Sequence, residues 1–173
     1  MEEENKQEDF IRVKVGAIML DPFTNVPIVI LKDEEEKNTV PIWIGLVEAS
    51  AIAIQLEKVS VSRPLTHDLL KNVLGLLSAE VDRIEVVDLR SNTFYAIIHV
   101  TVGDRHMEID SRPSDAIALA LRTESPIFVH KRVIEKSQKL DTKTIPTFNE
   151  ENKEKWAELL EDLNPDDFTK YKM

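Results

Sequence analysis

The stretch "IDSRPSDAIALALRTESPIFV", residues 109–129, combines the end of one strand, the start of a helix and the start of another strand. Asp110 follows Ile109 at the end of a predicted strand, Ser-Arg-Pro follows, and Asp115 opens a run of small apolar residues. Proline fits the first turn of a helix because its missing N–H has no partner there, and the helix dipole stabilises an acid in that turn. The stretch therefore predicts a helix at about 113–122 between two strands.

The rest of the chain predicts an α+β fold. Alternating or continuous apolar residues predict strands at 10–20, 27–33, 39–44, 82–90, 92–102, 105–110 and 126–130. Helical spacing predicts helices at 45–58, 66–79 and near 149–163, with Thr66 as the N-cap of the second. We expect a mainly antiparallel or mixed sheet with helices packed on it. The basic stretch at 130–139 is either a solvated helix face or a track for a phosphate backbone.

Two parts of the sequence resemble each other. Residues 42–57 align with residues 109–124, and the alignment places Glu48 on Asp115 and three alanines on three alanines. The match is either an internal duplication of a hairpin–helix unit or a chance match between two alanine-rich helices. A duplication predicts that each half is a hairpin leading into a helix with a carboxylate in its first turn.

The length of 173 residues predicts one domain with tails. We place an acidic tail at 1–9, the domain at 10–140, and a linker, an amphipathic helix and a tail at 141–173. The net charge of −10 argues against tight non-specific binding of nucleic acid, which depends on Lys and Arg. Residues 10–148, however, hold 19 acids and 17 basic residues, so a nucleic-acid substrate with weak binding remains compatible with the charge.

The sequence contains no cysteine, which excludes disulfides and thiolate metal sites. It contains no secretory signal and no apolar run long enough for a membrane span, so we expect a cytoplasmic protein without membrane contacts. An open hairpin edge and an amphipathic C-terminal helix would leave apolar surface uncovered, and we therefore expect a homodimer or higher oligomer.

Charged residues gather at the predicted strand ends and helix starts. The candidate catalytic residues are Glu48, His67, Asp68, Asp110 and Asp115, and the candidate phosphate-binding residues are Arg63, Arg112 and Ser114. Taken singly, each has a structural explanation as a helix cap, a dipole partner or an ion-pair partner. As a group, they suit phosphodiester hydrolysis, because carboxylates can hold Mg²⁺ or Mn²⁺ and Arg binds phosphate through two donors. Glu48, Asp110 and Asp115 are the expected metal ligands.

Four motifs resemble a known family. "PIWIGLVEASAIA" (41–53), "SRPLTHDLL" (62–70), "NTFYA" (92–96) and "IDSRPSDAIALALR" (109–122) followed by "PIFV" occur in the order and spacing of the bifunctional nuclease domain family. The resemblance covers about residues 11–135. It implies a compact α+β domain and nuclease activity on DNA and RNA, without a catalytic assignment for individual residues.

We therefore predict a metal-dependent nuclease that hydrolyses phosphodiester bonds of DNA and RNA without strong sequence specificity. The alternative is a non-catalytic scaffold module that binds a protein or a small anion through the same charged junctions.

Overall fold

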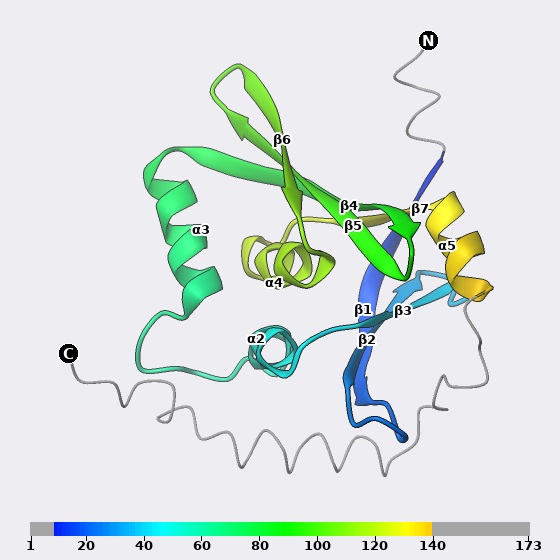
Figure 1. The fold of residues 1–173 in the computed structure, drawn as a ribbon. Helices are drawn as coiled ribbons and strands as arrows, with labels where there is room; N and C mark the ends of the chain where they lie inside the picture. The colour runs from blue at the N-terminus through cyan, green and yellow to red at the C-terminus, as the bar shows by residue number, and fades with distance from the viewer. Residues whose placement is uncertain (1–8, 140–173) are drawn as a thin grey trace.

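The computed structural model describes residues 9–139 (Figure 1). The strands in this part of the chain are β1 (Phe10–Leu20), β2 (Pro27–Asp33), β3 (Thr39–Trp43), β4 (Ala79–Arg90), β5 (Thr93–Val102), β6 (Arg105–Ser111) and β7 (Ile127–His130). The helices are α2 (Leu46–Leu56), α3 (Thr66–Leu76), α4 (Pro113–Thr123) and α5 (Lys131–Gln138). None of these helices is long and apolar enough to cross a membrane.

The strands form one seven-stranded sheet in the order β3-β2-β1-β7-β4-β5-β6. Only β7 and β4 run parallel, and the other neighbouring pairs are antiparallel. The helices pack on this sheet. The predicted α+β class with a mainly antiparallel, mixed sheet is confirmed.

The topology repeats within the sheet. The chain runs through β1, β2 and β3 into α2, and then through β4, β5 and β6 into α4, so each half is a strand meander that leads into a helix. In the second meander, the tight turn between β4 and β5 uses Ser91 and Asn92, with φ of 47° and 61°. Two successive residues with positive φ match the right-handed twist of a hairpin, and asparagine tolerates this conformation better than most residues. This repeated order agrees with the predicted hairpin–helix unit.

Helix α4 lies at the centre of the helical layer. It contacts α2, α3, β4 and β5, and Ala116, Ile117 and Ala118 are fully buried. Because α4 has neighbours on most of its circumference, small side chains are needed where α2 and the sheet approach its backbone. This explains why the sequence after Asp115 is a run of small apolar residues with few polar positions.

The sheet has two different faces, because side chains alternate along each strand. On β4 and β5, Ile84 and Ala96 are buried in the core shared with the helices. The intervening residues Glu85, Ile97 and His99 point to the opposite face, where they line an open pocket. The core cluster also contains residues of α2, α4 and α5, so these helices pack on the same face.

One expectation about the helices needs correction. Thr66 is the first residue of α3 and not its N-cap: Leu65 takes that place, and Asp68 Oδ2 accepts a 2.8 Å hydrogen bond from its N–H. The basic stretch after β7 forms α5, and its basic residues are exposed, which agrees with a solvated helix face, while Val133 and Ile134 on the other side belong to the core. The predicted helix near 149–163 lies outside the described residues.

Candidate active site at three helix starts

The first turns of α2, α3 and α4 meet on one side of the domain, where the three helices are neighbours in Figure 1. Each turn carries at least one charged or ionisable side chain: Glu48 on α2, His67 on α3 and Asp115 on α4. Arg112 occupies the N-cap position of α4, directly before Pro113. We define these residues, Glu48, His67, Arg112 and Asp115, as the helix-start centre.

Arg112 joins two carboxylates from different helices. Its Nε donates to Asp115 Oδ2 at 2.6 Å and its Nη2 donates to Asp115 Oδ1 at 3.2 Å. Its Nη1 donates to Glu48 Oε1 at 2.9 Å. The guanidinium therefore binds Asp115 through two donors and takes the place between the two acids that a shared cation would otherwise fill.

His67 completes the centre from α3. Its Nε2 lies 3.1 Å from Asp115 Oδ1, and its side chain is only 12 % exposed. A carboxylate that binds one ring nitrogen of a histidine orients the ring and leaves the other nitrogen to accept or donate a proton. The Arg112–Asp115–His67 series therefore combines a guanidinium, a group that can bind phosphate, with an imidazole, a group that can accept or donate a proton.

The local sequence explains the position of Glu48. Gly45 is the N-cap of α2, and a Cβ built at this residue would overlap the Glu48 carboxylate. Glycine at the helix start thus leaves room for Glu48 to fold back over the first turn, where the dipole of α2 also stabilises its negative charge. The Glu48 side chain is 21 % exposed, so it remains within reach of a ligand.

The electrostatics of the centre keep Asp115 ionised. Burial raises the pKa of Asp115, but the hydrogen bonds from Arg112 and His67 outweigh burial and hold its pKa below the usual value. The same contact with Asp115, followed by the charge of Glu48, raises the pKa of Arg112. The centre therefore contains two carboxylates against one guanidinium when His67 is neutral, which leaves a net charge of −1.

A second ion pair, between Arg122 of α4 and Asp68 of α3, holds the helices of the centre together. Arg122 in the last turn of α4 is buried, and its Nε donates to Asp68 Oδ1 at 2.6 Å. Its Nη1 donates to the carbonyls of Ala51 on α2 and Ala118 on α4, at 3.0 and 2.9 Å. Arg122 thus ties α2, α3 and α4 together, and Asp68 positions the start of α3, on which His67 lies.

Three predicted site residues lie apart from the centre. Asp110 pairs with Ile97 in the register of β6 and β5, which directs it to the sheet face opposite α4. Ser114 is buried, at 5 % exposure, so its hydroxyl is not presented at the surface beside Arg112. Arg63 is exposed in the connection before α3.

The expected metal site is not assembled as predicted. Within residues 9–139, no three His, Asp or Glu residues form a group that could hold a metal ion. Asp110 lies on the other face of the sheet, and Glu48 and Asp115 both bind Arg112. Magnesium binding uses carboxylate oxygens that face one ion at about 2.1 Å. The set of Glu48, Asp110 and Asp115 does not fit such an ion.

The sequence patterns do not identify Arg122 as the residue that joins α2, α3 and α4. The available signal was an arginine within the apolar run of a helix, because such a residue is rarely buried without a partner. Its partner Asp68 is 54 positions away in the sequence, and spacing along one helix does not reveal that pairing.

The fold and the helix-start centre define a small α+β domain with an arginine, a histidine and two carboxylates at one surface. The model of the bifunctional nuclease domain matches residues 29–141. The chain is 35 % identical to an uncharacterized protein of Mycobacterium tuberculosis over 161 residues, which cover 90 % of this chain and 96 % of that protein. It is 28 % identical to bifunctional nuclease 2 of Oryza sativa subsp. japonica over 109 residues, or 61 % of this chain and 34 % of the rice protein. Bifunctional nuclease 2 of Arabidopsis thaliana is 27 % identical over 107 residues, or 60 % of this chain and 32 % of that protein.

The chain therefore belongs to the bifunctional nuclease domain family. The family match begins within β2 and ends just beyond α5, so it contains all four residues of the helix-start centre.

Proposed function

We propose that this protein is a nuclease that hydrolyses phosphodiester bonds of DNA and RNA without strong sequence specificity, and that the helix-start centre performs the cleavage. The observation that carries the proposal is the contact of Arg112 and His67 with the two oxygens of one carboxylate, Asp115. Membership of a family named for nuclease activity, and the two plant relatives named bifunctional nuclease 2, support the same class of reaction.

Arg112 is the residue that we assign to phosphate binding. A guanidinium has five N–H donors, and three of its hydrogen bonds go to Asp115 and Glu48. The side chain is 65 % exposed, so the remaining donors face solvent and a substrate phosphate can reach them. Their role is to neutralise charge that develops on the phosphate oxygens as the bond to the leaving group breaks.

His67 is the residue that we assign to proton transfer. Asp115 fixes the ring through Nε2, so Nδ1 is the nitrogen left to take a proton from the attacking water or to return one to the leaving oxygen. Glu48 holds Arg112 from the other side and keeps its donors directed at one position. Asp68 and Arg122 act indirectly, because they hold α3 against α4.

The requirement for Mg²⁺ or Mn²⁺ stays a prediction. With a neutral His67, the net charge of −1 at the centre would repel a phosphate, which is a physical reason to test divalent cations in the assay. No step of the proposal above depends on the ion.

The test is cleavage of labelled single-stranded DNA and RNA by the purified full chain, with Mg²⁺, with Mn²⁺ and with EDTA. We expect cleavage of both substrates by the wild type, and its loss in Asp115→Asn and His67→Gln. Cleavage that continues unchanged in both variants would contradict the assignment, and a wild type that binds but never cleaves would favour the non-catalytic scaffold.

A further inference from the structure

The sheet face opposite the helices carries a second group of charged and aromatic side chains. The register places Arg12 of β1 beside Phe128 of β7, and Phe128 beside Glu85 of β4. Glu85 in turn lies beside Ile97 of β5, and Ile97 beside Asp110 of β6. A single row thus crosses five strands, and it contains the acid that the sequence had suggested for the helix-start centre.

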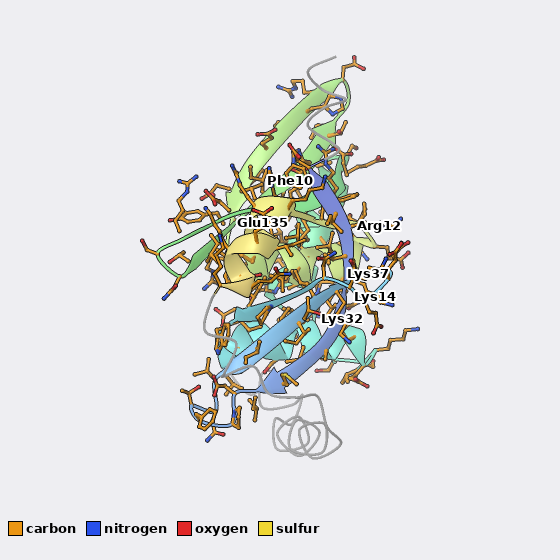
Figure 2. The ribbon with its side chains drawn as sticks, turned by 90° about the vertical axis from the view of Figure 1, so that its right-hand side faces the viewer. Phe10, Arg12, Lys14, Lys32, Lys37 and Glu135 are labelled. Atoms are coloured by element: carbon orange, nitrogen blue, oxygen red, sulfur yellow. The ribbon has the colours of Figure 1, made fainter. Side chains whose placement is uncertain are left out.

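Three cations lie together at one end of this face. Arg12 and Lys14 are two residues apart on β1, so their side chains lie on the same face, and both are exposed. Lys14 is the direct register partner of Lys32 on β2. Figure 2 shows Arg12, Lys14 and Lys32 following one another along β1 and onto β2. We call Arg12, Lys14 and Lys32 the cation stripe.

The cation stripe works against the stability of the sheet. Like charges directly opposite each other on neighbouring strands are destabilising. Lys32 Nζ has one weak partner, Glu36 Oε2 at 3.5 Å, and an exposed pair at that distance compensates little. The local sequence nevertheless accommodates Lys32. A Cβ at Gly16 would come within 2.8 Å of Lys32 Cδ, so the glycine at the β1 bulge leaves room for the Lys32 side chain to cross β1.

A pocket of about 710 Å³ continues the face beyond the cation stripe. Phe10 and Phe128 line it, and Phe10 meets His130 edge-to-face, with 4.9 Å between the ring centroids. Its lining includes Glu85 and His99, whose side chains are 11 % and 12 % exposed, and Glu85 Oε2 lies 3.0 Å from His99 Nε2 without hydrogen-bond geometry. Glu85 Oε1 accepts a 2.7 Å hydrogen bond from Arg83 Nε, which also lines the pocket. Pockets of this volume suit small organic groups.

We infer that this face is a binding site for single-stranded nucleic acid, separate from the helix-start centre. Phosphates lie along the cation stripe, and a base enters the pocket, where Phe128 offers a ring for stacking. The Glu85 carboxylate accepts hydrogen bonds from the amino groups at a base edge. The strand must be single, because a duplex hides the faces of its bases.

This inference deepens the proposed nuclease function by naming single strands as the bound form of the substrate. It rests on the proposed function for the role of the bound strand, whereas the binding itself can be measured without cleavage. The arginines that line the pocket, Arg83, Arg90 and Arg132, are each paired with Glu85 or Asp88. The pocket also contains acids, such as Glu108 and Asp9, that repel phosphate. Their position orients the ligand, because the backbone stays over the cation stripe and the uncharged base approaches the acids.

The test is fluorescence anisotropy of a labelled oligodeoxycytidylate, whose bases carry an amino group, with the full-length chain, between about 50 and 200 mM salt. We expect Arg12→Glu with Lys14→Glu to weaken binding at least about tenfold and to lower the slope of log affinity against log salt by about 1.4, since each neutralised phosphate of a single strand contributes about 0.7. The matched control is Lys58→Glu with Arg105→Glu, which changes the net charge equally at two exposed positions outside this face.

Phe128→Leu tests the stacking separately, because leucine keeps the apolar volume and removes the ring. We expect it to weaken binding about fivefold or more with an unchanged salt slope. Equal losses in the two charge-reversed proteins, or tighter binding of a duplex than of a single strand, would overturn the inference.

The same samples are examined for cleavage of the probe, so that the two proposals fail in different ways. If the wild type binds single strands through Arg12 and Lys14 but never cleaves them, the nuclease proposal is wrong and this inference stands. If the double variant Arg12→Glu, Lys14→Glu binds and cleaves like the wild type, this inference is wrong and the nuclease proposal stands.

Discussion

The sequence contains Ser-Arg-Pro twice, and the two copies have different structural roles. In residues 111–113, Arg112 is the N-cap of α4, Pro113 is its first residue, and the helix that follows is buried. In residues 62–64, the tripeptide ends before Leu65, the N-cap of α3. Arg63 is exposed there, and α3 has no buried residue.

The difference shows that position relative to the helix, and not the tripeptide, decides the role of the arginine. Arg112 starts a helix that neighbours α2 and α3, so its guanidinium meets carboxylates from its own helix and from α2. The first copy contributes to the site only through residues three to four positions after Pro64, namely His67 and Asp68. One copy supplies the arginine of the helix-start centre, and the segment after the other copy supplies its histidine.

The largest expected effect is on cleavage, and it compares the two arginines directly. Arg112→Gln removes a guanidinium that makes three hydrogen bonds to acids, and we expect cleavage to fall about 10³-fold, at the upper end for the loss of one charge-stabilising group. The matched change Arg63→Gln should lower the rate only a few-fold, through weaker substrate binding. Initial rates on single-stranded DNA measure both, and equal losses would mean that the two copies act alike.

The next effect concerns stability at the far end of α4. Arg122→Met leaves Asp68 without its buried partner and frees the carbonyl of Ala51, so we expect the free energy of unfolding to fall by about 3 kcal/mol. Arg90→Met is the control, because Arg90 also contacts an aspartate at 2.6 Å but is 66 % exposed. Urea denaturation should show a much smaller loss for the control. A loss as small in Arg122→Met would show that the buried pair does not hold α3 to α4.

A smaller effect depends on pH. Burial raises the pKa of Asp68, but the Leu65 N–H and Arg122 outweigh burial and hold it below the usual value. A lowered pKa in the folded state stabilises the protein above the unfolded value of about 3.9, and this stabilisation disappears as the pH falls through the folded pKa. Asp68→Asn keeps an oxygen that can accept from the Leu65 N–H, and Arg122 keeps its bonds to the carbonyls of Ala51 and Ala118, so this change should cost less than Arg122→Met. We expect a loss of about 1 kcal/mol at neutral pH and progressively less below about pH 4.

Asp104→Asn, an exposed position in the β5–β6 turn, serves as the control for that titration. Thermal unfolding from pH 7 to pH 3 should show a constant offset for Asp104→Asn and a closing gap for Asp68→Asn. A gap that stays constant in Asp68→Asn would show that Asp68 has no special interaction in the folded state.

The smallest expected effect on the fold concerns the exposed side of α3. Leu69 and Leu76 of α3 and its C-cap Leu77 are 59 %, 86 % and 64 % exposed. This apolar surface is a different one from the hairpin edge and the C-terminal helix on which the prediction of self-association rests, and that prediction is still to be tested. Leu76→Lys should change the unfolding free energy by less than about 0.5 kcal/mol but lower the mass of the assembly. Light scattering at micromolar concentration measures this, and a wild-type mass of one 19.8 kDa chain would refute the prediction.

Local patterns were sufficient to predict most of the fold. Alternation in β4 and β5, and the proline and acid that open α4, each concern neighbours in the chain. The order of strands was not predictable in this way, since β7 inserts between β1 and β4 and pairs in parallel with β4. Nothing within the four residues of β7 specifies those partners.

The candidate site was predictable in composition but not in geometry. Asp110 and Asp115 are close in sequence and were both assigned to one pocket. They separate because Asp110 still belongs to β6, where alternation directs it away from α4, whereas Asp115 is already helical. The contact of Arg112 with Glu48 spans 64 positions and depends on how α2 packs against α4.

The most direct test of the central claim is a double-mutant cycle on the cleavage rate, with His67→Gln, Asp115→Asn and the combined variant. The account predicts that His67 and Asp115 act as one unit through their 3.1 Å contact, so the combined variant should be hardly slower than the slower of the two single variants. Losses that multiply in the combined variant, or single variants that cleave at the wild-type rate, would contradict it.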